Sequence, residues 1–206
     1  MIKKIKNQIF DSFFNIKEKN DYLANNKLFG LWIYIMSDCI MFAVLFAVYA
    51  IIFNNLPVNF INHKIFNLSS VFFETLILLL SSLTCAMVTI EQNKKNIKMV
   101  YFYLIVTFFL GLLFLVIELN EFYNLFLEHH TPNKHAFFSI FFTLIGTHGV
   151  HIIFGLILIL SIIYQIFKLG LTNIVQVRIL CFSLFWHFLD IIWVCIFTLV
   201  YLNGVI

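Results

Sequence analysis

The sequence predicts an all-α integral membrane protein, built as a bundle of five transmembrane helices. Hydrophobic residues make up 62% of the 206 residues and charged residues only 11%, which is more apolar surface than a soluble core of this size can bury. The chain also contains five apolar runs. Each run exceeds the roughly 20 residues that cross a ~30 Å hydrocarbon layer.

The elements follow one another in a simple order. Residues 1–27 form a polar tail that is rich in Lys and leads into the first span. The fourth span is long enough that it must tilt or protrude from the bilayer. Short connections make consecutive helices antiparallel neighbours in one domain, residues 28–203. The spans are expected at about 28–53, 69–90, 97–119, 136–167 and 179–201.

The distribution of basic residues predicts the topology. If the N-terminus is cytoplasmic, the inner segments hold eleven Lys or Arg residues, whereas the outer segments hold only Lys64 and Lys134. The positive-inside rule therefore places the N-terminus in the cytoplasm and the C-terminus outside it. The net charge is only +3, and the basic residues do not form a continuous face, so a nucleic-acid partner is excluded.

Ionisable residues inside the spans are the candidate functional residues, because such groups are costly at membrane depth and commonly functional. At a rise of about 1.5 Å per residue, Asp38, His187 and Asp190 lie roughly 12 to 17 Å from the cytoplasmic ends of their spans. His148 and His151 lie near the middle of the membrane. Two pairs in this group are three residues apart and should each share a helix face. The sequence thus predicts one mixed cluster at middle depth: Asp38, His148, His151, His187 and Asp190.

Other polar and aromatic residues fall nearer the membrane surfaces or flank this cluster. Three carboxylates lie towards the outer ends of their spans: Glu74, Glu118 and Glu121. Gly146, Gly149 and Gly155 allow a neighbouring helix to approach closely. Four further residues are expected to contact lipid or to pack helices together: Trp32, Trp186, Trp193 and Arg178.

The residues alone leave three roles open for the cluster: hydrogen bonding between helices, a metal or haem site, and a proton path. The His-Glu spacings of di-iron bundles are absent. A two-haem bundle would need His pairs on two spans, but the last span has only His187. No hydrolase elbow, phosphate-binding loop or dinucleotide fingerprint is present. We therefore expect no catalytic residue and no bound metal in this chain.

Five segments, in order along the chain, resemble subunit III of the haem-copper respiratory oxidases. The paired segments GTHGVHIIFG, residues 146–155, and LFWHFLDIIW, residues 184–193, are the most specific. The others are LWIYIMSDCIMF at 31–42, ETLILLLSSLT at 74–84 and GLLFLVIELNEF at 111–122. The resemblance covers about residues 28–203. The larger, mitochondrial-type form of this subunit has seven spans. With five, the chain resembles the bacterial cytochrome bo-type ubiquinol oxidase branch.

The resemblance implies an accessory subunit in a bacterial inner membrane, with its C-terminus in the periplasm. Such a subunit binds no haem or copper and packs on subunit I, where quinol is oxidised, oxygen is reduced and protons are pumped. The family also implies a cleft that holds phospholipid, and its buried carboxylate falls on Asp38. Its His and Asp positions fall on His148, His151, His187 and Asp190.

Two residues depart from the family pattern. Asp38 stands where the family most often has Glu, and Phe185 stands where a Tyr is common. A different class of function also remains open, a stand-alone transporter or proton channel that uses the same buried cluster. Transporters often have helices broken by Pro or Gly at middle depth. Here Pro57 and Pro132 both lie in the connections expected outside.

Overall fold

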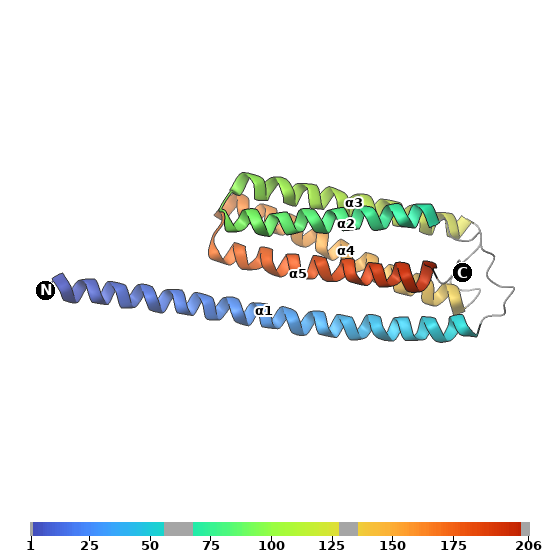
Figure 1. Ribbon diagram of the computed structural model, residues 1–206, viewed down its shortest axis with the longest axis horizontal. Helices are drawn as coiled ribbons and strands as arrows, with labels where there is room; N and C mark the ends of the chain where they lie inside the picture. The colour runs from blue at the N-terminus through green and yellow to red at the C-terminus, as the bar shows by residue number, and fades with distance from the viewer. Residues whose placement is uncertain (1, 56–67, 128–135, 203–206) are drawn as a thin grey trace.

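The computed structural model contains five long helices. It describes residues 2–55, 68–127 and 136–202, with side chains at 25–55, 70–125, 127 and 136–202. Figure 1 shows the helices running side by side, with the N-terminal part of α1 projecting beyond the other four. The helices are α1 (Ile2–Asn54), α2 (Leu68–Asn93), α3 (Ile97–Leu127), α4 (Ala136–Leu169) and α5 (Asn173–Ile196), followed directly by a π-helix, η1 (Phe197–Leu202).

Each long helix contains a stretch that is long and apolar enough to cross a membrane. The predicted class, an all-α membrane protein with five spans, is confirmed. The helices extend beyond the predicted spans, because polar residues continue them without a break. The tail from residue 2 onwards is part of α1, and α3 continues to Leu127. No Pro or Gly interrupts residues 120–127, so Glu121 belongs to a helix rather than to a loop.

Tight turns join α2 to α3 and α4 to α5 at the same end of the bundle (Figure 1). Gly170 ends α4 with a positive φ of 67°, and its N–H donates a hydrogen bond of 2.9 Å to the carbonyl oxygen of Ile166. A glycine adopts this left-handed conformation without a steric penalty, and so it terminates the helix cleanly. Both turns bring consecutive helices into contact as antiparallel neighbours.

Helix α5 lies at the centre of the bundle, in contact with α1, α2 and α4. Its Trp186 is 1% exposed, and the indole Nε1 donates a hydrogen bond of 3.1 Å to Ser81 Oγ on α2. The same indole packs directly against Gly111 on α3 and Gly155 on α4. One side chain thereby joins four helices, and the two glycines provide the space for it.

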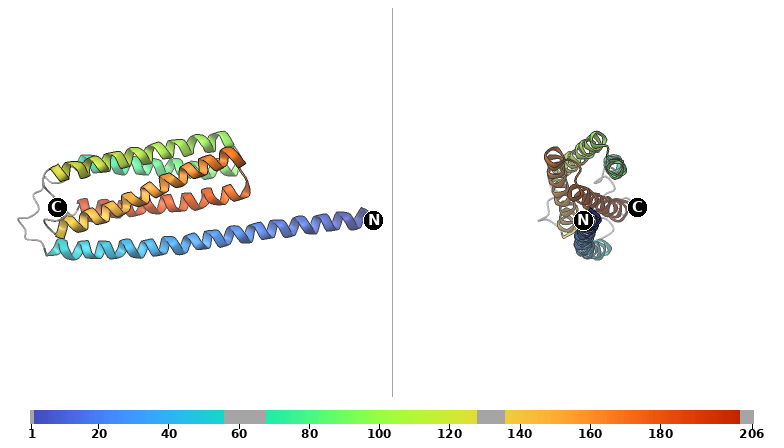
Figure 2. Two further views of the ribbon diagram at one scale, coloured as in Figure 1. Left: turned by 180° about the vertical axis from the view of Figure 1, so that it is seen from behind. Right: turned by 90° about the vertical axis from the view of Figure 1, so that its left-hand side faces the viewer.

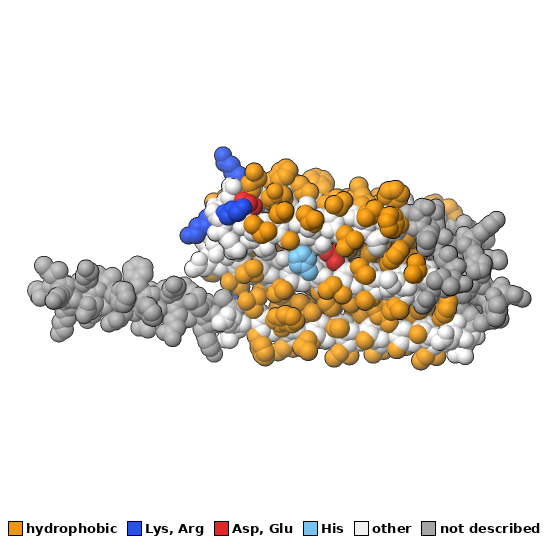
Figure 3. Space-filling view, in the orientation of Figure 1, with side chains coloured by type: hydrophobic (Ala, Val, Ile, Leu, Met, Phe, Trp, Pro, Cys, Tyr) orange, Lys and Arg blue, Asp and Glu red, His pale blue; other side chains and the backbone are white. Residues whose placement is uncertain are grey.

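Helix α1 lies at the edge of the bundle, where it packs against α4 and α5 (Figure 2). Many of its large apolar side chains face outwards, including Trp32, which is 54% exposed. Figure 3 shows apolar side chains spread along the bundle, with basic side chains gathered at one end. The basic residues of the α2–α3 turn lie in exposed positions, as Lys94 and Lys95 do. This pattern suits a bundle surrounded by lipid and other apolar chains.

Candidate functional site

Asp38 on α1 and His151 on α4 form one of the contacts that link the edge helix to the bundle. The distance from His151 Nε2 to Asp38 Oδ2 is 3.5 Å, and the imidazole also packs against the ring of Phe42. The other ring nitrogen, Nδ1, lies 2.7 Å from the carbonyl oxygen of Thr147. A carbonyl only accepts, so this contact assigns a proton to Nδ1. Asp38 Oδ2 has no hydrogen-bond partner among the described residues, so its nearest basic group is His151 Nε2 at 3.5 Å.

His148 has different neighbours from His151, although the two are only three residues apart. It is fully buried, and its ring stacks on Trp193 of α5 with centroids 5.2 Å apart and an interplanar angle of 30°. Phe114 of α3 meets the same ring edge-on at 6.0 Å. His148 therefore belongs to the interior of the bundle, whereas His151 faces α1.

Asp190 occupies a third setting, between α5 and α2. It is buried, and neither of its carboxylate oxygens has a hydrogen-bond partner among the described residues. His187, one turn earlier on α5, is partly exposed. Figure 3 shows one histidine and one acidic side chain next to each other within the apolar surface.

The predicted single cluster of Asp38, His148, His151, His187 and Asp190 is thus divided by the structure. Equal depth does not bring the residues together, although α1 packs against both α4 and α5, because His148 faces Trp193 and Phe114 inside the bundle rather than α1. The rotation of α5 about its own axis directs Asp190 towards α2 instead. Of the five residues, Asp38 and His151 are the pair whose charged groups the structure places within 4 Å of each other.

The three carboxylates expected near the outer ends do gather within the bundle. Glu74 interacts electrostatically with Glu118 and Glu121, and Tyr201 of η1 interacts with all three. The Tyr201 hydroxyl donates a hydrogen bond of 3.4 Å to Glu121 Oε2. Gly149 of α4 provides space for this group, because a β-carbon there would lie 3.2 Å from Glu118 Oε1. The sequence did not single out Tyr201, since a Tyr near a span end usually marks only the membrane interface.

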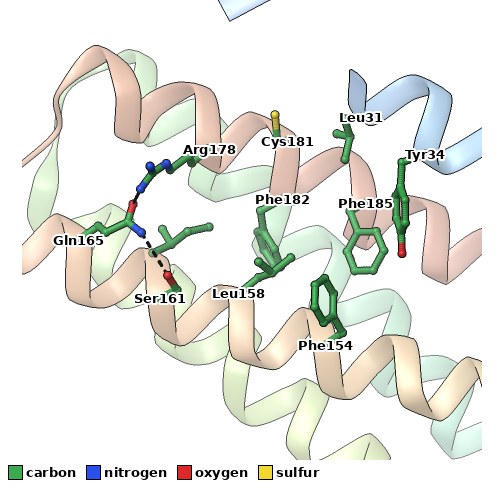
Figure 4. Close-up of a pocket in the computed structure, with 11 residues that line it drawn as sticks. Leu31, Tyr34, Phe154, Leu158, Ser161, Gln165, Arg178, Cys181, Phe182 and Phe185 are labelled. Atoms are coloured by element: carbon green, nitrogen blue, oxygen red, sulfur yellow. Dashed lines mark hydrogen bonds between the residues drawn. The ribbon is translucent and has the colours of Figure 1, made fainter. Parts of the chain in front are cut away.

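A pocket of about 640 Å³ lies between α1, α4 and α5. Figure 4 shows a polar group at one end and aromatic rings at the other. At the polar end Arg178 donates a hydrogen bond to Gln165 Oε1, and Gln165 Nε2 donates to Ser161 Oγ at 3.1 Å. The remaining lining is mostly apolar: Leu31, Tyr34, Phe154, Leu158, Ile162, Cys181, Phe182 and Phe185.

The residues predicted to contact lipid or to pack helices separate into two groups. Trp186 and Trp193 are each 1% exposed and pack inside the bundle, whereas Trp32 lies on its outer surface and Arg178 lines the pocket. Ser81, the hydrogen-bond partner of Trp186, was missed by the sequence analysis. A Ser in an apolar run gives no signal of its own, and its spacing from a Trp on a distant helix is not encoded locally.

The surroundings of His148 and His151 do not fit a haem or copper site. His148 is enclosed by the rings of Trp193 and Phe114, and both nitrogens of His151 face Asp38 or a backbone carbonyl. Among the residues that the structure describes, no three His, Cys, Asp or Glu side chains converge as metal ligands.

The comparison with known proteins identifies the family. The family described as cytochrome c oxidase subunit III matches residues 15–205. The chain is 72% identical over 184 residues, 89% of its length, to 97% of a cytochrome bo(3) ubiquinol oxidase subunit 3 of Buchnera aphidicola from Schizaphis graminum. It is 44% identical over 181 residues, 88% of its length, to 87% of the protein of that name from Pseudomonas aeruginosa. It is also 37% identical over 177 residues, 86% of its length, to 87% of a quinol oxidase subunit 3 from Bacillus subtilis.

These matches confirm the resemblance that the five sequence segments carried. The family match begins at residue 15, within α1, and runs beyond the end of η1, so it covers α2 to α5 completely. The chain therefore belongs to the cytochrome c oxidase subunit III family.

Proposed function

We propose that this chain is subunit III of a haem-copper ubiquinol oxidase and acts as an accessory subunit without a redox centre of its own. The observation that carries the proposal is the 72% identity to a ubiquinol oxidase subunit 3 over 97% of that protein. Because the two sequences are so similar over most of their length, we expect this chain to assemble into the same kind of complex as that relative. The enzyme activity then belongs to the complex, as ubiquinol oxidation coupled to oxygen reduction and proton transport.

Haem and copper are assigned to subunit I, against which this chain would pack and which it would stabilise. The side chains of this subunit would then contribute packing and protonation near subunit I rather than electron transfer. The bacterial inner membrane is the proposed location, with the N-terminus and the α2–α3 turn in the cytoplasm. The basic residues at that turn, Lys94, Lys95 and Lys98, support this orientation.

Phospholipid is the proposed ligand of the pocket between α1, α4 and α5. Its apolar walls suit an acyl chain, and its volume of about 640 Å³ falls in the range of small-molecule sites. Arg178 stands at the polar end, close to one end of α5. A guanidinium binds phosphate through charge-assisted hydrogen bonds, so Arg178 would hold the headgroup while the chains extend towards Phe154 and Phe185.

The function is tested by purifying the tagged chain from its own membrane in a mild detergent. We expect larger oxidase subunits to co-purify with the chain and the preparation to oxidise ubiquinol with oxygen. Purification of the chain alone, with no oxidase subunit, would contradict the proposal. Proton flux through the isolated chain in liposomes would then favour the transporter alternative.

The lipid site is tested separately, by native mass spectrometry of the purified complex. Replacing Arg178 with Ala should weaken lipid retention about tenfold, because one charge-assisted hydrogen bond is lost. Lys168→Ala is the matched control, since Lys168 is a basic residue in the last turn of α4 that does not line the pocket. Equal retention of lipid in both variants would exclude Arg178 as the headgroup ligand.

A further inference from the structure

The group formed by Glu74, Glu118, His148 and Trp193, which we name the buried acid cluster, has more polar atoms than protein partners. Glu74 is 0% exposed and Glu118 is 3% exposed. Both carboxylate oxygens of each, both ring nitrogens of His148 and Nε1 of Trp193 are buried without a hydrogen-bond partner among the described residues. That makes seven polar atoms from four helices, and the proposed function assigns a role to none of them.

A series of packing and electrostatic interactions connects these four residues across the bundle. Glu74 interacts with Glu118, and Glu118 lies against Gly149, the residue next to His148. His148 stacks on Trp193, and Trp193 packs in turn against Tyr201, with ring centroids 6.4 Å apart. Tyr201 connects Trp193 back to the carboxylates, because it interacts electrostatically with both Glu74 and Glu118.

Leaving so many polar groups without partners is energetically unfavourable. A buried amide or hydroxyl that loses its hydrogen bond costs about 1–3 kcal/mol, and a buried charge costs more. His148 and Trp193 lie on other helices than the two carboxylates, and their ring nitrogens also lack hydrogen-bond partners among the described residues. Small polar ligands must therefore satisfy the cluster in the folded protein.

Water is the ligand whose chemistry fits. A buried water typically makes about three hydrogen bonds, and it both donates and accepts. The carboxylates can only accept when ionised, the indole N–H only donates, and the imidazole does one at each nitrogen. A metal ion fits less well, because no three ligands converge in the described part of the chain. Water can bridge groups that point in different directions.

We propose that the buried acid cluster is an internal water-binding site, and that its carboxyl groups carry at least one exchangeable proton. Two carboxylates buried in one apolar bundle are not stable as two negative charges. Glu121 and Tyr201 form the side of the site nearest the end of α3, where Glu121 is partly exposed. Protons and water exchange with the membrane surface through this side. On the other side, His148 interacts with His151, which leads towards Asp38.

The first test is radiolytic labelling, in which short X-ray pulses convert water into hydroxyl radicals that oxidise nearby side chains. It compares Trp193 with Trp186, which is equally buried on the same helix but has its Nε1 bonded to Ser81. The proposal predicts that Trp193 and His148 are labelled several-fold more than Trp186. Equal, low labelling of both tryptophans would show that the cluster is dry and would overturn the proposal. The labelling is read on the full chain as purified from its membrane, so it does not depend on which subunits accompany it.

The second test is infrared spectroscopy of the same material after transfer to D₂O. We expect a carboxylic-acid C=O band that shifts in D₂O and loses intensity in Glu74→Gln or Glu118→Gln, two substitutions that preserve side-chain size. Glu91→Gln is the control, because Glu91 lies at the other end of α2 in an ion pair with Lys94. If both cluster variants keep the full band, the carboxyl groups hold no proton and the proposal fails.

Discussion

The indole of Trp186 lies directly against the backbone of Gly155, so closely that a β-carbon on residue 155 would be 2.7 Å from Cζ3. The ring cannot move away easily, because its Nε1 is hydrogen-bonded to Ser81 and its far edge meets Gly111. The packing of α2, α3, α4 and α5 therefore depends on residues that have little or no side chain.

We predict that Gly155→Ala destabilises the chain by about 1–3 kcal/mol, the usual cost of overpacking a core. Thermal unfolding in detergent, followed by Trp fluorescence, measures the change. Gly146→Ala is the control on the same helix, because a β-carbon there meets nothing within 4 Å. It should be neutral or slightly stabilising, as Ala favours helix over Gly. Equal destabilisation by both substitutions would contradict the packing described here.

Ser81→Ala should leave the Trp186 N–H buried without its acceptor, at a cost of about 1–3 kcal/mol. The same substitution in a Trp186→Phe background should cost much less, because the donor is then absent. A double-mutant cycle on unfolding in detergent gives the coupling energy. A coupling near zero would mean that the 3.1 Å contact does not stabilise the fold.

We predict that Asp38→Asn leaves the haem content of the oxidase complex normal but lowers its proton pumping or its lifetime during turnover. An amide keeps the size of the side chain but cannot form an ion pair with His151 Nε2, which lies 3.5 Å from the carboxylate. Ser37→Ala, at the neighbouring exposed position, is the control. Unchanged pumping and lifetime in Asp38→Asn would reduce the Asp38–His151 pair to a packing contact between α1 and α4.

The orientation predicted from the basic residues is tested with single cysteines in a background without Cys39, Cys85, Cys181 and Cys195. A cysteine that replaces Lys95 in the α2–α3 turn should react with an impermeant maleimide only after the cells are opened. A cysteine introduced at the C-terminus should react in intact spheroplasts. The opposite pattern would invert the topology and place the buried acid cluster near the cytoplasmic surface.

The sequence predicted the number and type of helices, because an apolar run long enough to cross a bilayer has few alternatives. It also placed Glu74, Glu118 and Glu121 together, since residues near the same ends of antiparallel helices share a depth. The same reasoning from membrane depth wrongly placed Asp38 and Asp190 in one cluster, because depth does not tell which neighbouring helix a side chain faces. That information depends on helix rotation and on the position of α1 at the edge of the bundle.

The close contacts of Trp186 were only partly predictable. Gly155 was expected to allow a close approach, but the sequence could not say that an indole from α5 would occupy the space. Tyr201 illustrates the same limit, because it reaches the carboxylates from a π-helix. A π-turn changes the direction of the side chains that follow it, and a helical pattern of period 3.6 does not foresee that change.

The central claim, an oxidase subunit without its own redox centre, is tested most directly by a reduced-minus-oxidised visible spectrum before and after this chain is stripped from the complex. We predict that haem absorbance remains with the larger subunits and that the separated chain is colourless. A separated chain that retains haem absorbance would contradict the account, because it would show that this chain binds haem itself.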